Sequence, residues 1–79
     1  MQYSYRIPDG DQQPVDVGLY DMAGRRVRML ASGSQASGQY TVTWDGRSDA
    51  GSLLSPGVYF LRARVAGALN TSRVIFIRR

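Results

Sequence analysis

Apolar and polar side chains alternate with a period of two along most of this chain, and this alternation limits the fold more than any other feature. It is typical of β-strands that bury one face and expose the other. Turn-forming clusters of Gly, Pro, Asp and Ser separate the segments at intervals of about 8–12 residues, as in β-sandwiches. No segment has the period of an amphipathic helix. The clearest alternating positions are Tyr3, Tyr5 and Ile7; Val15, Val17 and Leu19; Tyr40, Val42 and Trp44; and Tyr59, Leu61, Ala63 and Val65.

The pattern therefore predicts an all-β chain, an antiparallel β-sandwich of about seven strands that forms one domain over residues 1–79. We expect a loop at 31–38 that crosses between sheets and a short strand at 53–54. A long strand over 58–65, a turn over 66–70 and a last strand over 71–77 should follow. The shared phase of the apolar positions predicts a core that contains Val17, Leu19, Tyr40, Val42, Trp44, Tyr59 and Leu61.

Most residue types that carry enzyme chemistry are absent, since the chain has no His, Cys, Lys or Glu. A serine nucleophile would lack any side-chain base other than Asp, and zinc would find neither imidazole nor thiolate. Asp45 and Asp49 are too few carboxylates for a tight calcium site, and we expect both to bond their own loop backbone. We therefore predict no enzymatic activity, no metal site and no cofactor. No stretch approaches the roughly 18 apolar residues of a transmembrane helix.

The ten basic residues are all arginine and the six acidic residues are all aspartate, which gives a net charge of +4. Arg62 and Arg64 share one strand face, and Arg28 or Arg73 would join them from neighbouring strands. Such a stripe suits nucleic acid or an anionic glycan. Sheets that bind nucleic acid usually add stacking aromatic residues, and Phe60 is the sole aromatic on that face of its strand. We therefore expect no nucleic-acid partner and favour a solvated face, with an anionic glycan left open.

Three motifs resemble a known family in order and spacing. They are LYDMAGRRV at residues 19–27, GQYTVTWDG at 38–46 and SPGVYF at 55–60. Together they are similar to the flagellar hook-capping-type Ig-like domain and to the C-terminal sorting domains of type IX secretion cargo. The resemblance covers nearly the whole chain and implies an immunoglobulin-like sandwich. The structural positions of the motifs are Trp44, Asp45, Gly46, Gly57 and Tyr59.

The sorting resemblance implies a non-catalytic C-terminal module that directs a larger secreted protein to the cell surface. Its partners would be the outer-membrane secretion machinery and anionic lipopolysaccharide, and we expect the domain itself to be a monomer. Two alternatives stay open: a carbohydrate-binding or spacer module of an extracellular glycosidase, and a structural Ig-like domain as in hook-capping proteins. The candidate recognition residues are Asp21, Gly24 and Arg25 in a hairpin, and Arg73 and Arg78 on the final strand, where sorting domains often carry Lys.

Overall fold

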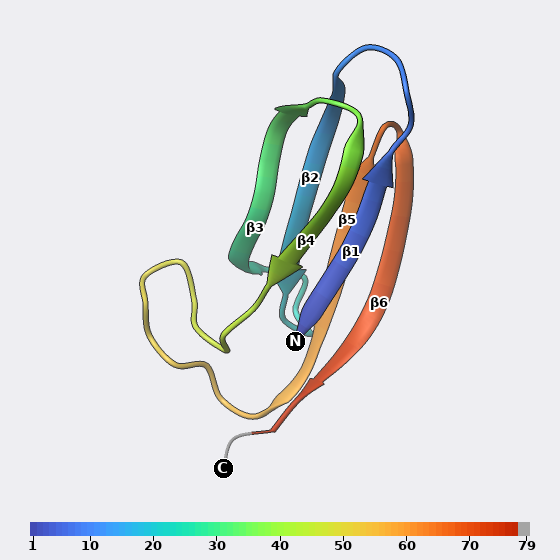
Figure 1. The fold of residues 1–79 in the computed structure, drawn as a ribbon. Coiled ribbons are helices and arrows are strands. Elements are labelled where there is room, and N and C mark those ends of the chain that lie inside the picture. Colours follow the sequence, from blue (N-terminus) through green and yellow to red (C-terminus); the bar gives the residue numbers. More distant parts are fainter. Residues whose placement is uncertain (78–79) are drawn as a thin grey trace.

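The fold is an all-β sandwich of two antiparallel sheets, seen here in a computed structural model that describes residues 1–77 (Figure 1). A two-stranded sheet, β1–β4, packs against a four-stranded sheet in the order β3-β2-β5-β6. No helix long and apolar enough to cross a membrane occurs among the described residues. The strands are β1 (Gln2–Ile7), β2 (Gln13–Tyr20), β3 (Arg26–Gln35), β4 (Gly38–Thr43), β5 (Gly57–Val65) and β6 (Ala68–Phe76).

The fold class predicted from the alternation is confirmed, but residues 1–77 form six strands and not seven. The short strand expected at 53–54 is absent. Leu53 makes only an isolated bridge to Arg47, and the N–H of Leu54 donates to the carbonyl of Gly46 (2.9 Å). This stretch therefore pairs within the loop 44–56 that connects β4 to β5, and it joins neither sheet.

The core lies between the inward faces of the two sheets, as the period of two predicts. Five of the seven predicted core residues are buried, and Tyr40 and Val42 are half-buried. Both of these lie on β4, which pairs only with β1 in the small sheet. No further strand flanks β4 there, so its side chains stay partly open to solvent. Tyr40 still stacks on Tyr5, with ring centroids 5.4 Å apart. The buried core comprises Tyr5, Ile7, Val15, Val17, Leu19, Trp44, Tyr59, Leu61 and Ala63.

The prediction of a loop over 31–38 was wrong, because β3 continues to Gln35. Its small and polar residues pair with β2, for example Ala31 with Val17 and Gly33 with Val15. An edge strand needs few apolar side chains when its backbone is already bonded to a central strand. Only residues 36–37 remain outside strands, and there the chain does cross to the second sheet, as expected (Figure 1).

The turn between the last two strands is shorter than the predicted 66–70. It consists of Ala66 and Gly67, and Val65 pairs directly with Ala68. Both turn residues have positive φ, 52° and 84°, as in the two-residue turns that match the twist of a β-hairpin. Strand β6 therefore starts three residues earlier than predicted. It lies at the edge of the four-stranded sheet.

Candidate functional site

The hairpin between β2 and β3 holds three of the candidate recognition residues in one rigid turn. Asp21 Oδ1 accepts hydrogen bonds from the N–H groups of Ala23 (3.0 Å) and Arg25 (2.9 Å). The N–H of Gly24 donates to the carbonyl of Asp21 (3.0 Å), and Gly24 adopts φ +85°. An aspartate that bonds the backbone and a glycine in the left-handed region are typical turn chemistry, so local hydrogen bonds fix the shape of this turn.

This hairpin presents two exposed side chains on its fixed backbone. The Arg25 side chain is 83% exposed, and its Nε lies 3.4 Å from Asp21 Oδ2. Met22, at the turn itself, is 74% exposed. An ion pair so open to solvent contributes little to stability. The hairpin therefore owes its shape to the backbone hydrogen bonds of Asp21, and recognition of it by an export machinery stays a prediction.

The charge of Asp21 links the hairpin to pH. The pKa of Asp21 is lowered, chiefly because its carboxylate accepts the N–H of Arg25. Partial desolvation raises the pKa and opposes this effect, whereas the N–H of Ala23 and the charge of Arg25 lower it further. The stabilisation is thus present above the unfolded pKa of about 3.9 and lost as the pH falls through the folded pKa. We expect Asp21→Asn, which keeps the acceptor but removes the charge, to lower the melting temperature at pH 7.

Thermal melts from pH 7 to pH 2.5 check this expectation. The gap between the wild type and Asp21→Asn should close as the carboxyl becomes protonated, whereas Asp21→Ala should stay less stable throughout because it lacks the acceptor. A gap between wild type and Asp21→Asn that is unchanged over this range would contradict the assignment.

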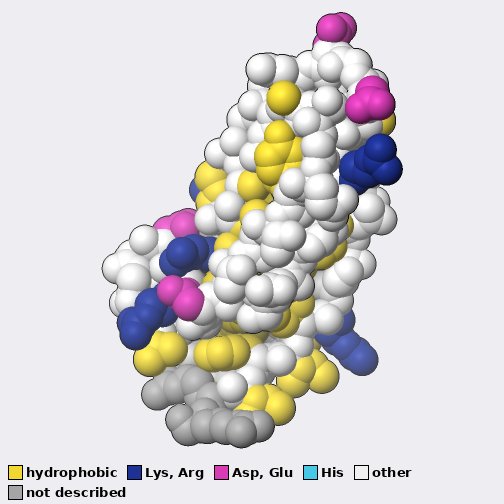
Figure 2. Space-filling view, in the orientation of Figure 1, with side chains coloured by type: hydrophobic (Ala, Val, Ile, Leu, Met, Phe, Trp, Pro, Cys, Tyr) yellow, Lys and Arg dark blue, Asp and Glu magenta, His cyan; other side chains and the backbone are white. Residues whose placement is uncertain are grey.

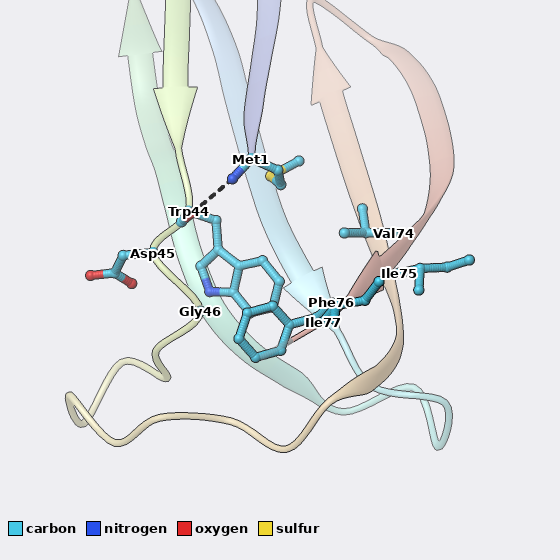
Figure 3. Close-up of a pocket in the computed structure, with 8 residues that line it drawn as sticks. All are labelled: Met1, Trp44, Asp45, Gly46, Val74, Ile75, Phe76 and Ile77. Atoms are coloured by element: carbon cyan, nitrogen blue, oxygen red, sulfur yellow. Dashed lines mark hydrogen bonds between the residues drawn. The ribbon is translucent and has the colours of Figure 1, made fainter. Parts of the chain in front are cut away.

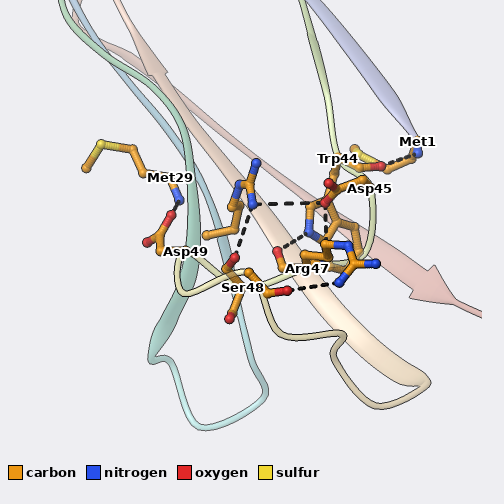
Figure 4. A network of polar contacts seen from close by, with 9 residues as sticks. Met1, Met29, Trp44, Asp45, Arg47, Ser48 and Asp49 are labelled. Atoms are coloured by element: carbon orange, nitrogen blue, oxygen red, sulfur yellow. Dashed lines mark hydrogen bonds and ion pairs between the residues drawn. The ribbon is translucent and has the colours of Figure 1, made fainter.

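The loop 44–56 is held by polar contacts at one end of the sandwich (Figure 4). Trp44 Nε1 donates to the carbonyl of Arg47 (3.0 Å), and Asp45 Oδ1 accepts the N–H of Arg47 (3.1 Å). The guanidinium of Arg47 bonds the carbonyl of Gly51 (2.9 Å). Met1 and Trp44 exchange two hydrogen bonds, 3.0 and 2.9 Å, which extend the β1–β4 pairing by one step. As predicted, Asp45 bonds its own loop.

Asp49 behaves differently, because it bonds strand β3 and not its own loop. Its Oδ1 accepts the N–H of Met29 (2.9 Å), and its N–H donates to the carbonyl of Val27 (3.0 Å). The expectation that Asp49 bonds its own loop was therefore wrong. Its backbone and carboxylate take the place of a neighbouring strand and cover the first part of the free edge of β3. In residues 1–77 no group of three acidic, histidine or cysteine side chains could hold a metal ion.

Arg28 also belongs to this loop contact. Its Nη1 donates to the carbonyl of Ser48 (3.1 Å) and lies 4.0 Å from Asp45 Oδ1. The possibility that Arg28 joins the stripe of Arg62 and Arg64 is thus not realised. Arg73 does join it, because it lies directly opposite Phe60, two positions before Arg62 on the same face of β5.

Three aromatic side chains and one glycine close the core at this end of the molecule. The ring centroid of Trp44 lies 5.4 Å from that of Tyr59 and 5.0 Å from that of Phe76. Gly46 adopts φ +83°, and a Cβ placed there would lie 2.5 Å from Phe76 Cζ. Beside these rings is a hollow of about 410 Å³, which Met1, Trp44, Asp45, Gly46 and the end of β6 line (Figure 3).

The two edges of the four-stranded sheet differ in how they meet solvent. Strand β3 pairs with β2 through two register shifts, and Asp49 covers part of its edge. Strand β6 pairs with β5 over nine consecutive residues without a shift, and no other strand of residues 1–77 pairs with it. Near its end Ile75 is 63% exposed, and Ile77 just beyond it is 73% exposed. Hydrophobic side chains gather at this end of the molecule (Figure 2).

The side of the sandwich between β1 and β6 is also open. Asn70 and Ser72 pair with the buried Ala63 and with Leu61, so they are on the inward face of β6, yet both are exposed. The small sheet ends at β1 and does not reach over them. A second hollow, about 440 Å³, lies here between residues 3–8 and the β5–β6 turn. An unpaired, regular edge beside an uncovered sheet face is a template for another strand.

The structure brings together part of the predicted recognition set. Phe60 lies opposite both Tyr20 and Arg73, so Arg73 and the hairpin that follows Tyr20 share one end of the four-stranded sheet. Arg78 lies outside the described residues. Sequence reasoning missed the contact of Asp49 with β3 and the pairing of Tyr20 with Phe60. Gly18, a glycine inside a strand, was the available signal that side chains approach closely beside it.

Comparisons with known proteins place these motifs in context. The model of the FlgD Ig-like domain family matches residues 5–68 of the chain. The solved structure of FlgD from P. aeruginosa is similar at 26% sequence identity and a TM-score of 0.58, over 95% of this chain and 58% of that one. The chain thus corresponds to somewhat more than half of that FlgD chain. No curated protein matches it.

Proposed function

The chain belongs to the FlgD Ig-like domain family, and on that premise we propose that it is a structural, non-catalytic module of a flagellar-type extracellular assembly. Its role is to hold a protein partner through the edge of its four-stranded sheet. The lack of His, Cys, Lys and Glu agrees with a role without catalysis. The alternative of a structural Ig-like domain is better supported by the family match than the sorting role.

The observation that carries this proposal is the free edge of β6. Along the nine residues of β6, every second residue directs its N–H and C=O groups away from β5, and no strand of residues 1–77 pairs with them. Long regular edges of this kind are normally covered, bulged or charged, because they otherwise pair with other chains. On the opposite edge of the sheet, bulges and Asp49 interrupt the first part of β3. Arg73 is the single charge on β6, and the exposed Ile75 favours a dry contact at its end.

A chimeric hook-capping protein tests the proposal. The matching part of P. aeruginosa FlgD would be replaced by residues 1–79, and hook assembly and swimming would be measured in a strain without its own FlgD. We expect the chimera to assemble hooks. Ile75→Lys should abolish assembly, because a charge at this edge position blocks strand pairing and cannot be buried in an apolar contact.

Thr43→Lys is the matched control, since it adds the same charge at an exposed position of β4. This variant should assemble hooks like the unmodified chimera. A soluble, folded chimera that assembles no hooks would overturn the structural role, and equal assembly by both lysine variants would overturn the role of the β6 edge.

Export to the cell surface is a separate prediction that rests on the resemblance to sorting domains alone. A reporter fused to this domain, expressed in a host with type IX secretion, would be scored as surface-exposed or periplasmic. The Arg73→Ser/Arg78→Ser variant tests the two arginines. A periplasmic reporter in a competent host contradicts this prediction, together with the predicted contact with the secretion machinery and lipopolysaccharide.

A further inference from the structure

The outer face of the four-stranded sheet carries a charged surface that neither the core nor the β6 edge contact uses. The strand register aligns two aromatic side chains, Tyr20 and Phe60, in the middle of one row across the sheet, with an arginine at each end. Two more arginines follow on β5 along the same face. We call this surface the arginine face; it consists of Arg26, Arg62, Arg64 and Arg73 around Tyr20 and Phe60.

The arginines of this face are exposed and have no acidic partner. The ion pairs of residues 1–77 involve Arg25 and Arg28, so no described carboxylate lies within 4.0 Å of the four guanidinium groups. The outer face of the β1–β4 sheet, which points to the viewer in Figure 2, has a single arginine, Arg6, among its strand residues. Among the described residues, this face therefore holds four of the eight arginines.

Side chains of the arginine face pack against one another and against the sheet. The guanidinium carbon of Arg62 lies 5.0 Å from the centroid of the Tyr20 ring, in cation–π geometry. Gly18 is buried beside them, and a Cβ there would lie 3.4 Å from both Arg26 Cδ and Tyr20 Cε1. The Arg26 stem and the Tyr20 ring therefore both pack close to the backbone of Gly18.

A polar hollow of about 200 Å³ adjoins these residues, and side chains of opposite charge line it. Asp16, Tyr20, Arg62, Arg64 and Leu69 line it. Asp16 and Arg64 are direct cross-strand neighbours, yet they form no ion pair within 4.0 Å. The hollow thus offers the Arg64 guanidinium and the Asp16 carboxylate, which form no ion pair with each other, beside the Tyr20 ring.

We propose that the arginine face binds an acidic polysaccharide built from uronic acid units. Arginine forks suit the carboxylates of such a chain, and the Asp16 carboxylate accepts hydrogen bonds from sugar hydroxyl groups. The rings of Tyr20 and Phe60 give the apolar C–H faces of the sugars a surface to pack on. Asp16 repels any polyanion, but a polyphosphate backbone or an acidic peptide has few hydroxyl donors with which to offset that repulsion. This role is additional to the protein contact through β6.

Calorimetric titration of the 79-residue chain with oligogalacturonate at low salt tests the proposal. We expect saturable binding that weakens as salt rises, and no binding of a neutral dextran of the same length. Arg64→Ser should weaken binding about tenfold, the usual loss for one hydrogen-bonded charge. Arg6→Ser is the matched control, because it removes the same charge from the opposite face, and should change the affinity less than about twofold.

Asp16→Asn separates sugar recognition from plain charge attraction. Removal of a negative charge strengthens a purely electrostatic contact, whereas loss of a hydroxyl acceptor weakens a specific one, so we expect several-fold weaker binding. Melting curves verify that each variant is folded. Tighter binding by Asp16→Asn, equal losses for Arg64→Ser and Arg6→Ser, or equal affinity for polyglutamate or single-stranded DNA of matched charge would each overturn the proposal.

Discussion

Replacement of Trp44 by alanine is expected to lower the free energy of unfolding by about 3–5 kcal/mol, as for other large buried aromatic side chains. Trp44 is only 3% exposed and packs on Tyr59 and Phe76. The change would leave a cavity and remove the indole hydrogen bond that anchors the loop at Arg47. Against a total stability of about 5–15 kcal/mol, such a loss would leave a large part of the chain unfolded.

Urea denaturation followed by far-ultraviolet circular dichroism measures this effect without depending on tryptophan fluorescence. Trp44→Phe is the matched control: it keeps a buried ring but gives up the indole N–H, so it should cost less than the alanine variant. If the urea midpoint of Trp44→Ala equals that of the wild type, Trp44 does not hold this end of the core.

Gly46→Ala is expected to lower the free energy of unfolding by about 2–5 kcal/mol through two separate effects. A residue with a Cβ pays a penalty of about 1–2 kcal/mol at the left-handed φ of +83°. The new methyl group would also lie 2.5 Å from Phe76 Cζ, and displacement of a packed ring adds about 1–3 kcal/mol.

Gly51→Ala in the same loop isolates the second effect. Gly51 has a similar φ of +88°, but nothing lies within 4 Å of its added Cβ. The free energies of unfolding of the two variants, measured by urea denaturation, should therefore differ by the cost of moving Phe76. In the Gly46→Ala background, Phe76→Leu should recover part of the lost stability. Equal destabilisation at the two glycines would show that Phe76 yields freely and that only backbone strain matters.

The period of two was sufficient to predict the fold wherever a strand buries one face. Val17 and Leu19 on β2 and Tyr59 and Leu61 on β5 are core residues for this reason. The same rule failed at Ala31–Gln35, because an edge strand bonded to β2 needs no apolar alternation of its own. It also misplaced the last turn, since the positive φ of Ala66 is set by the β5–β6 pairing and not by a typical turn residue.

The candidate site was predictable only in its local part. The hairpin at Asp21 is stabilised by hydrogen bonds within five residues, so its sequence was enough to foresee it. The contact of Asp49 with Met29 spans twenty residues, and the row that joins Tyr20 to Arg73 depends on the register of three strands. Such pairings follow from the assembled sheet, and no periodicity within a single segment encodes them.

The unequal edges of the four-stranded sheet limit how many copies or partners can associate through it. Bulges and Asp49 obstruct the first part of the β3 edge, so a strand that joins the sheet is expected to pair at β6, where neither obstacle is present. Two such sheets that meet at β6 form a closed pair. A sheet with two free edges would instead add units at both ends and grow into an open fibre.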